Sequence, residues 1–195
     1  MRDHGLKSFA EVVAHYRAEK KPQAENELRW FRIQRKIHGA VRLAGLASGP
    51  HGRRFRHQYR IPRTALRKAS RALLRTLRHL GRCKSFDALL QQVHATISPI
   101  PRIGPLMVYD TALRIGARLG LSPDQVYLHA GTRHGAAVLG FARSRVSISL
   151  AELPPPLHRL TAEEAEDILC IYATDLARLA QPSSSKRVKV MGTRE

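Results

Sequence analysis

A proline- and glycine-rich turn between two apolar helical patterns constrains the fold of this chain most. The turn is Ile100-Pro101-Arg102-Ile103-Gly104-Pro105. Apolar residues with helical spacing run from Phe86 to Ile97 before it and from about Leu106 to Leu119 after it. The second pattern is apolar on nearly all sides, which indicates a helix at the centre of the fold. The sequence therefore predicts a helix, a tight turn and a helix over about 85–119.

Helical patterns dominate the rest of the chain as well. Ser8 and Thr161 each begin a capping box, and Pro22 and Pro62 stand where helices start. We therefore expect an all-α fold, a single compact multi-helix domain over 1–180, with a disordered basic tail over 181–195. The expected helices are 8–20, 22–37, 62–80, 85–97, 106–119, a short one from 122–124, another over 132–139, and 161–180. Residues 45–61 should form a loop, and 146–150 a lone strand.

The chain carries a large positive charge that gathers in one region. Its formal net charge is +19, and arginine is far commoner than lysine. No acidic residue lies between Glu27 and Asp87, a stretch that holds 17 lysines and arginines. Arginine binds phosphate oxygens with a planar fork of donors and also stacks on bases. These features favour a nucleic-acid partner, and we expect double-stranded DNA.

The predicted helix 62–80 segregates its apolar and charged residues. Leucines and alanines fall on one side, and six arginines fall on the other, within an arc of about 120°. The loop before it interleaves arginines with Phe55 and Tyr59, as single-strand or flipped-base contacts do. An ordinary solvated helix face and a place for both aromatic rings in the core are the alternatives. The expected DNA contacts in this region are Arg53, Arg54, Arg56, Arg67, Arg71, Arg75 and Arg78.

The turn itself resembles a known DNA-binding element. Ile100-Pro101-Arg102-Ile103-Gly104 is similar to the Leu-Pro-Gly-Val-Gly hairpin of the helix-hairpin-helix DNA glycosylase superfamily, and Leu128-His129-Ala130-Gly131-Thr132-Arg133 lies about where that family has its catalytic segment. The resemblance covers about 55 residues. Arg102 stands where the family has its first hairpin glycine, and His129 where it has its catalytic aspartate. The resemblance implies that Arg102, Ile103 and Gly104 contact DNA.

The resemblance also implies a reaction, the hydrolysis of the N-glycosidic bond of a base rotated out of the duplex. A carboxylate assists this reaction by stabilising the cationic sugar or by activating water. The candidate catalytic residues are Asp110, Asp124 and His129, and Tyr109 joins Phe55 and Tyr59 as a candidate for the base pocket. Asp110 has an alternative as an ion-pair partner of Arg114, and Asp124 as a helix cap.

The expected product follows from one position. Family members that also cut the strand use a lysine two residues beyond the last hairpin glycine, and that position is Leu106 in this chain. We therefore expect a monofunctional glycosylase that leaves an intact abasic strand. Its target is a damaged or modified base, and repair and defence against modified phage DNA remain equally open roles.

Other classes find little support in the sequence. Two isolated cysteines, Cys83 and Cys170, favour neither a disulfide framework nor an iron–sulfur cluster, and no metal-binding or cofactor motif is present. We expect no metal, no cofactor, no membrane span and no signal peptide, and hence a cytoplasmic monomer. The alternative function is a non-catalytic helix-hairpin-helix DNA-binding module. An RNA-associated protein is a third possibility, without any RNA-recognition signature.

Overall fold

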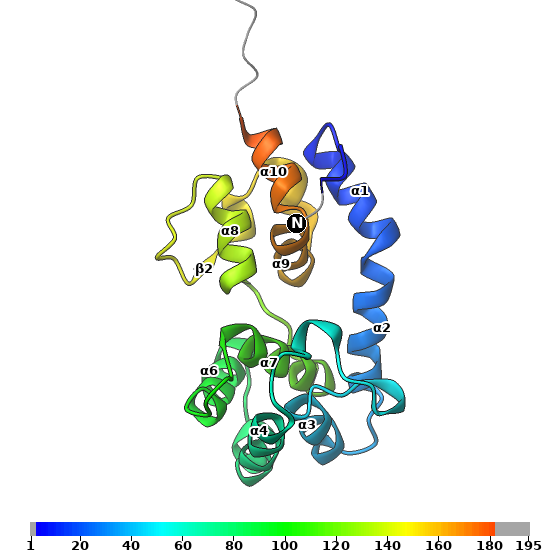
Figure 1. Cartoon of the computed structure of the whole chain (residues 1–195), viewed down its shortest axis with the longest axis vertical. Helices are drawn as coiled ribbons and strands as arrows, with labels where there is room; N and C mark the ends of the chain where they lie inside the picture. Colours follow the sequence, from blue (N-terminus) through cyan, green and yellow to red (C-terminus); the bar gives the residue numbers. More distant parts are fainter. Residues whose placement is uncertain (1–2, 182–195) are drawn as a thin grey trace, which may run out of the picture.

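The computed structural model describes residues 3–181, and most of them lie in helices (Figure 1). Two short strands, β1 (Val126–Tyr127) and β2 (Ser147–Ile148), pair antiparallel. No helix in this part of the chain has the length and apolar character needed to cross a membrane. The helices are α1 (Phe9–Glu19), α2 (Lys21–Arg32), α3 (Ile37–Gly45), α4 (Arg63–Arg75), α5 (Leu77–Leu80), α6 (Phe86–Ile97), α7 (Pro105–Leu119), α8 (Ala130–Val138), α9 (Ala162–Ile171) and α10 (Ala173–Ala180), with short 3-10 turns η1 (Pro50–Gly52), η2 (Arg56–Gln58), η3 (Leu150–Glu152) and η4 (Pro155–Arg159).

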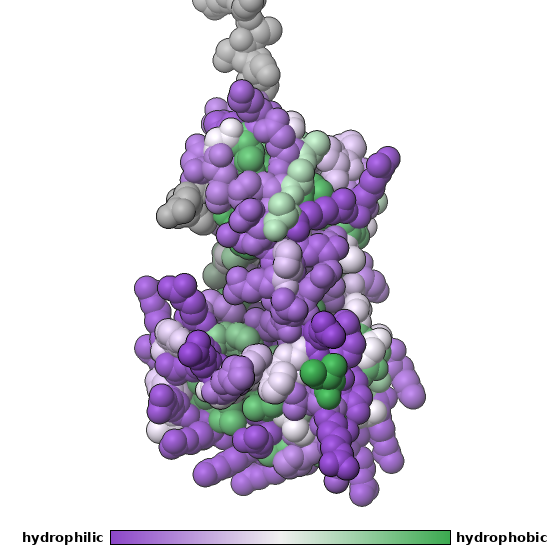
Figure 2. Space-filling model, turned by 90° about the vertical axis from the view of Figure 1, so that its right-hand side faces the viewer, coloured by the Kyte–Doolittle hydropathy of each residue, from purple (hydrophilic) through white to green (hydrophobic). Residues whose placement is uncertain are grey.

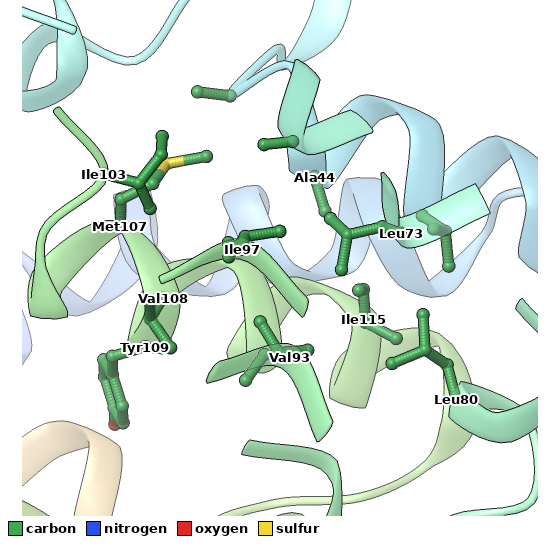
Figure 3. Packing of buried hydrophobic residues seen from close by; sticks show 14 of the residues in the cluster. Ala44, Leu73, Leu80, Val93, Ile97, Ile103, Met107, Val108, Tyr109 and Ile115 are labelled. Carbon is green, nitrogen blue, oxygen red and sulfur yellow. The ribbon is translucent and has the colours of Figure 1, made fainter. Parts of the chain in front are cut away.

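The buried apolar residues form two clusters, which we call the first and second core. The first core gathers side chains from α3, α4, α6 and α7 around residues such as Leu73, Ile97 and Ile115, which are all fully buried (Figure 3). The second core joins α1, α8, α9 and α10 with the two strands, and includes Tyr16, Ile148 and Ile168. Figure 1 shows these two groups of helices one above the other.

Helices α1 and α2 run along one side of both groups (Figure 1). α1 contributes Val12, Val13 and Tyr16 to the second core, whereas α2 contributes Phe31 to the first. On the face in Figure 2, hydrophilic side chains cover most of both groups, in keeping with the high charge of the sequence.

The two helices predicted around the central turn are present as α6 and α7. The Ser85 hydroxyl caps α6 by accepting a hydrogen bond from the Ala88 N–H. α7 begins at Pro105 and ends at Gly120, whose φ of 73° is the left-handed conformation usual after a helix. Ile103 and Met107 anchor the turn and the start of α7 in the first core (Figure 3). α7 is central in the fold, as its apolar pattern predicts.

Other predicted elements need correction. The predicted helix 62–80 is two helices that break at Thr76, and the predicted helix 161–180 breaks at Tyr172. The predicted helix 22–37 ends at Arg32. Residues 37–45, most of which lie in no predicted helix, form α3, because Ala40, Val41 and Ala44 complete the first core. Ser122-Pro123-Asp124 does not start a helix, since the chain continues into β1, which gives the strand at 147–148 its partner. The predicted tail lies outside the described residues, except for Gln181.

Close packing of α8 on α9 makes a glycine necessary in α8. A Cβ at Gly135 would overlap the backbone carbonyl of Leu169. We expect Gly135→Ala to lower the free energy of unfolding by about 1–3 kcal/mol, because neither backbone can move away without disturbing the second core. Urea unfolding measures the change.

The matched control is Gly39→Ala in α3, where a Cβ would meet only the Gln34 Oε1 atom at 3.6 Å. Alanine favours a helix over glycine by up to about 1 kcal/mol, so this variant should be as stable as the parent or more so. Equal loss of stability in the two variants would contradict the proposed contact between α8 and α9.

Candidate functional site

An arginine surface follows α4 and α5. Arg63, Arg67, Arg71 and Arg75 are exposed on one side of α4. None of them forms an ion pair with any described residue. Arg78 and Arg82 are also exposed, but they follow the break at Thr76, so the predicted single stripe of six does not continue straight past α4. Unpaired guanidinium groups on a helix face are suited to contact phosphates.

The loop before α4 divides its arginines between two roles. Arg53 and Arg56 are exposed. Arg54 instead donates hydrogen bonds to the carbonyl oxygens of Ile61 and Tyr59, at 2.8 and 3.0 Å, and its guanidinium lies 5.1 Å from the centre of the Tyr59 ring. Arg54 therefore stabilises the loop, and Arg53 and Arg56 are free to contact a ligand.

The turn between α6 and α7 presents its backbone. Arg102 is exposed and has a φ of 75°, in the left-handed region that a residue with a side chain rarely adopts. The Ile103 side chain is buried, and Gly104 precedes α7 without any side-chain cap. The first N–H groups of α7 are consequently open to an anion.

A cleft with a volume of about 570 Å³ lies between the two cores. Its walls come from the end of α1, from α2, from η2, from one side of α7 and from the start of α9. Seven of the chain's 15 acidic residues line it, against two arginines, one lysine and one histidine. The acidic residues are Glu25, Glu27, Asp110, Glu163, Glu164, Glu166 and Asp167.

A buried arginine holds the α7 wall of this cleft in place. Arg114 is 1% exposed. Its Nε and one terminal nitrogen lie 2.8 and 2.7 Å from Glu27 Oε1, and the other terminal nitrogen donates to the Gln58 side-chain oxygen at 3.0 Å. The guanidinium also stacks on the Phe55 ring, 4.0 Å from its centre. Arg114 therefore connects α2, the loop before α4, and α7.

Asp110 lies in the cleft beside this arginine. Its Oδ2 accepts a hydrogen bond from the Gln58 amide at 2.6 Å and lies 2.8 Å from His57 Nε2. The Arg114 guanidinium is 3.7 Å away, so the predicted pair with Arg114 exists but is the longest of the three contacts. The hydrogen bond to Asp110 raises the pKa of His57. The Oδ1 atom of Asp110 has no hydrogen-bond partner among the described residues, which leaves it open to a ligand.

The α9 wall carries carboxyl groups in a different environment. Burial raises the pKa of Glu163 and Glu166, and it raises the pKa of Asp167 to about 7. Tyr16 donates a hydrogen bond to Asp167 at 2.8 Å. This wall therefore offers one carboxyl group, that of Asp167, whose pKa lies near neutral pH, opposite the Asp110 carboxylate, whose charge Arg114 and His57 balance.

His129 and Tyr109 lie behind the cleft instead of lining it. His129 is buried at the start of α8, where its Nε2 pairs with Glu166 and its Nδ1 has no partner within residues 3–181. Tyr109 is also buried and packs against Phe86 and Tyr127, and its hydroxyl has no hydrogen-bond partner in the described part of the chain. His129 thus reaches the cleft only through Glu166, and the Tyr109 ring is not open to a base.

The remaining predicted site residues lie elsewhere. Asp124 is exposed in the turn before β1 and does not line the cleft. Phe55 packs against the first core under Arg114, and Tyr59 is 54% exposed at a separate cavity. Tyr16 is the aromatic residue in the cleft wall. Its place in an amphipathic helix of the sequence predicts only that it is buried in a core.

Most residues of the cleft could not be predicted from the sequence. Glu27, His57, Gln58 and the acidic residues of α9 are far apart in the sequence, and no spacing connects them. One signal was present, since Glu163-Glu164-Ala165-Glu166-Asp167 is a dense acidic run in a basic chain. By itself, this acidic run predicts only the start of a capped helix.

Comparison with family models, with curated proteins and with solved structures finds no match for this chain. Within the described residues, no three histidine, cysteine or acidic side chains gather closely enough to hold a metal ion. The function of this chain must therefore be inferred from the cleft and from the surface around it.

The cleft predicts how stability depends on pH. The unfolded chain releases the Asp167 proton near pH 4, whereas the folded chain holds it until about pH 7. Folding therefore binds a proton between these values, and stability should fall as pH rises from 4 to 7. We expect Asp167→Asn to reduce the fall in unfolding free energy between pH 5 and pH 8 by an amount on the order of 2 kcal/mol, measured by urea unfolding.

Asp124→Asn is the control, because that side chain is exposed. Its pH profile should run parallel to that of the parent. A parallel profile for Asp167→Asn as well would show that Asp167 is ionised in the folded protein, against this description of the cleft.

Proposed function

We propose that this protein is a monofunctional DNA glycosylase, which binds double-stranded DNA through its arginine surface and hydrolyses the N-glycosidic bond of a damaged or modified base in the acidic cleft. The observation that carries the proposal is the separation of charge: an acidic cleft, with Asp110 in its wall, within a chain of net charge +19. Phosphates are attracted to the arginines and repelled from the cleft. A base and its sugar can enter where the backbone cannot.

The turn before α7 supports the resemblance to the helix-hairpin-helix family. Its Arg102 occupies the position of the first family glycine and has the positive φ that glycine adopts most easily. The turn precedes a 15-residue helix whose N-terminus lacks a side-chain cap. In this proposal the backbone of residues 102–104 binds one phosphate, and Asp110, about 9 Å further along the helix, acts on the nucleotide beside it.

Cleavage of the bond leaves positive charge on the sugar, which a carboxylate stabilises. Asp110 Oδ1 performs this role and orients the water that attacks C1′, while its Oδ2 stays bound to His57 and Gln58. A carboxyl group of the α9 wall gives its proton to the departing base. The water supplies a hydroxyl to the sugar and a proton to the protein, so the products are a free base and an abasic strand.

The expectation of an intact strand depends on Leu106, which is half-buried in the first turn of α7. Strand-cutting relatives of the resembled family have a lysine at this position, and leucine has no nucleophile. The attacking group is therefore water, and no covalent intermediate forms with the protein.

One observation favours the second candidate, a non-catalytic DNA-binding module. The aromatic rings expected to hold a flipped base do not line the cleft, because Tyr109 is buried and Phe55 is covered by Arg114. Tyr16, the aromatic residue in the cleft wall, is itself fully buried. The experiments below separate the two candidates.

The arginine surface predicts a dependence of DNA affinity on salt. If the protein neutralises about six phosphates, the logarithm of the association constant should fall with the logarithm of salt concentration at a slope of about −5. Arg71→Gln with Arg75→Gln should flatten the slope by about one or two, in titrations of a labelled duplex.

The control removes equal charge from exposed residues of the other helix group, with Arg17→Gln and Arg159→Gln. Its slope should match that of the parent. A slope changed by the control and not by the α4 variant would place the DNA on the other side of the molecule.

The cleft predicts loss of base release in Asp110→Asn. The assay uses duplexes that each contain one damaged or modified base, and abasic sites are detected by alkaline cleavage. For any duplex that the parent acts on, we expect a rate at least about 100-fold lower, because the stabilising charge is lost while the amide keeps the size of the side chain. DNA affinity should stay equal or rise slightly.

Asp124→Asn should keep full activity, and circular dichroism checks the folding of both variants. Borohydride should trap no adduct between the protein and DNA. Full activity in Asp110→Asn, or a trapped adduct, would exclude this mechanism. DNA binding without release of any base would favour the non-catalytic module.

A further inference from the structure

A second cavity lies next to the loop that supports Asp110. It has a volume of about 820 Å³, within the range of small-molecule sites. Its walls are the loop after α3, residues 53–59, and the first turn of α4. His57, from the same loop, lines the acidic cleft. One loop therefore contributes to two cavities of opposite charge.

The lining of this second cavity is basic. Four of its nine lining residues are arginines, and none is acidic. Arg53, Arg63 and Arg67 have no ion-pair or hydrogen-bond partner for their side chains in the described part of the chain, and only Arg54 is engaged by the loop. Three unpaired guanidinium groups around one hollow are complementary to a phosphate.

The backbone around the cavity has a fixed shape. Ala47, His51 and Gly52 adopt positive φ angles of 51°, 57° and 69°. Ser48 and Arg54 form an isolated bridge, and the Phe55 N–H donates to the Ala47 carbonyl at 3.1 Å. The loop after α3 is thus closed on itself, and its backbone forms one wall of the cavity.

The shape limits what can enter. The outer surface of a DNA duplex is convex, so its phosphates contact protruding side chains such as those of Arg71 and Arg75. A concave cavity instead accepts a nucleotide that has left the duplex. Tyr59 adds a second preference, since the residue is 54% exposed at the cavity and Arg54 lies against its ring. An exposed aromatic ring beside phosphate-binding groups is the arrangement that proteins use to hold single-stranded nucleotides.

We propose that this cavity binds one unpaired nucleotide of a DNA strand, with its phosphate among Arg53, Arg63 and Arg67 and its base stacked on Tyr59. The inference shares only the DNA partner with the proposed glycosylase function. It holds whether or not the acidic cleft is catalytic. The cleft and this cavity are separate sites, and each has its own variants.

The test measures binding of the deoxydinucleotide pTpT to the full-length protein by isothermal titration calorimetry. We expect Tyr59→Ala to weaken binding roughly tenfold, because a base loses its stacking partner. Tyr59→Phe should bind like the parent, since it keeps the ring. Arg63→Gln with Arg67→Gln should weaken binding by at least as much as Tyr59→Ala.

Two controls make the result specific. Arg71→Gln with Arg75→Gln removes equal charge from the same helix outside the cavity, and Asp124→Asn changes an exposed carboxylate that lines neither cavity. Both should bind pTpT like the parent. Equal weakening by the two double-arginine variants would show general attraction and overturn the proposal. So would pTpT affinity no higher than that of inorganic phosphate, or tighter binding of the ribodinucleotide pUpU. This experiment does not measure base release, so a negative result would not contradict the glycosylase proposal. Likewise, a protein that releases no base could still bind pTpT in this cavity.

Discussion

The buried guanidinium of Arg114 is the interaction on which the candidate site depends. It is 1% exposed, and its charge is balanced inside the protein by Glu27 and, at longer range, by Asp110. A buried charge without such partners would be strongly destabilising. The same group donates to Gln58 and stacks on Phe55, so one side chain positions α2, the loop before α4 and the middle of α7. Asp110 is oriented by neighbours that Arg114 itself holds.

Acidic and basic side chains are also separated over the molecule as a whole. Seven of the 15 acidic residues line one cleft, while the exposed arginines of α4 have no acidic partner among the described residues. Such a distribution attracts a polyanion to the surface and keeps its phosphates out of the cleft. Burial also raises the pKa of Glu163, Glu166 and Asp167 in α9, with Asp167 at about 7. A cleft that disfavours its own negative charge is well suited to a ligand or transition state that carries positive charge.

Local patterns in the sequence predicted the helices, and long-range contacts decided the rest. The hydroxyl caps at Ser8, Ser85 and Thr161 form as predicted, since a cap depends only on residues three apart. The capping box predicted at Ser8 is incomplete, because the Glu11 carboxylate accepts from the Lys7 N–H and not from the Ser8 N–H. The breaks at Thr76 and Tyr172 were not predicted, because the apolar spacing continues through both. Of the two carboxylates that the sequence offers as catalytic candidates, Asp110 lies in the cleft and Asp124 does not, and a catalytic role for either stays a prediction. His57, Gln58 and the α9 carboxyl groups come together only through folding, and a single sequence holds no sign of that.

The central claim is that the Asp110 carboxylate stabilises positive charge on the sugar of a nucleotide in the cleft. It can be measured without knowing which base is released, with duplexes that contain either a cationic pyrrolidine or a neutral tetrahydrofuran in place of one nucleotide. The protein should bind the pyrrolidine duplex more tightly by about tenfold or more, and Asp110→Asn should abolish this preference while leaving affinity for the tetrahydrofuran duplex unchanged. Equal affinity of the unaltered protein for the two duplexes would contradict the account.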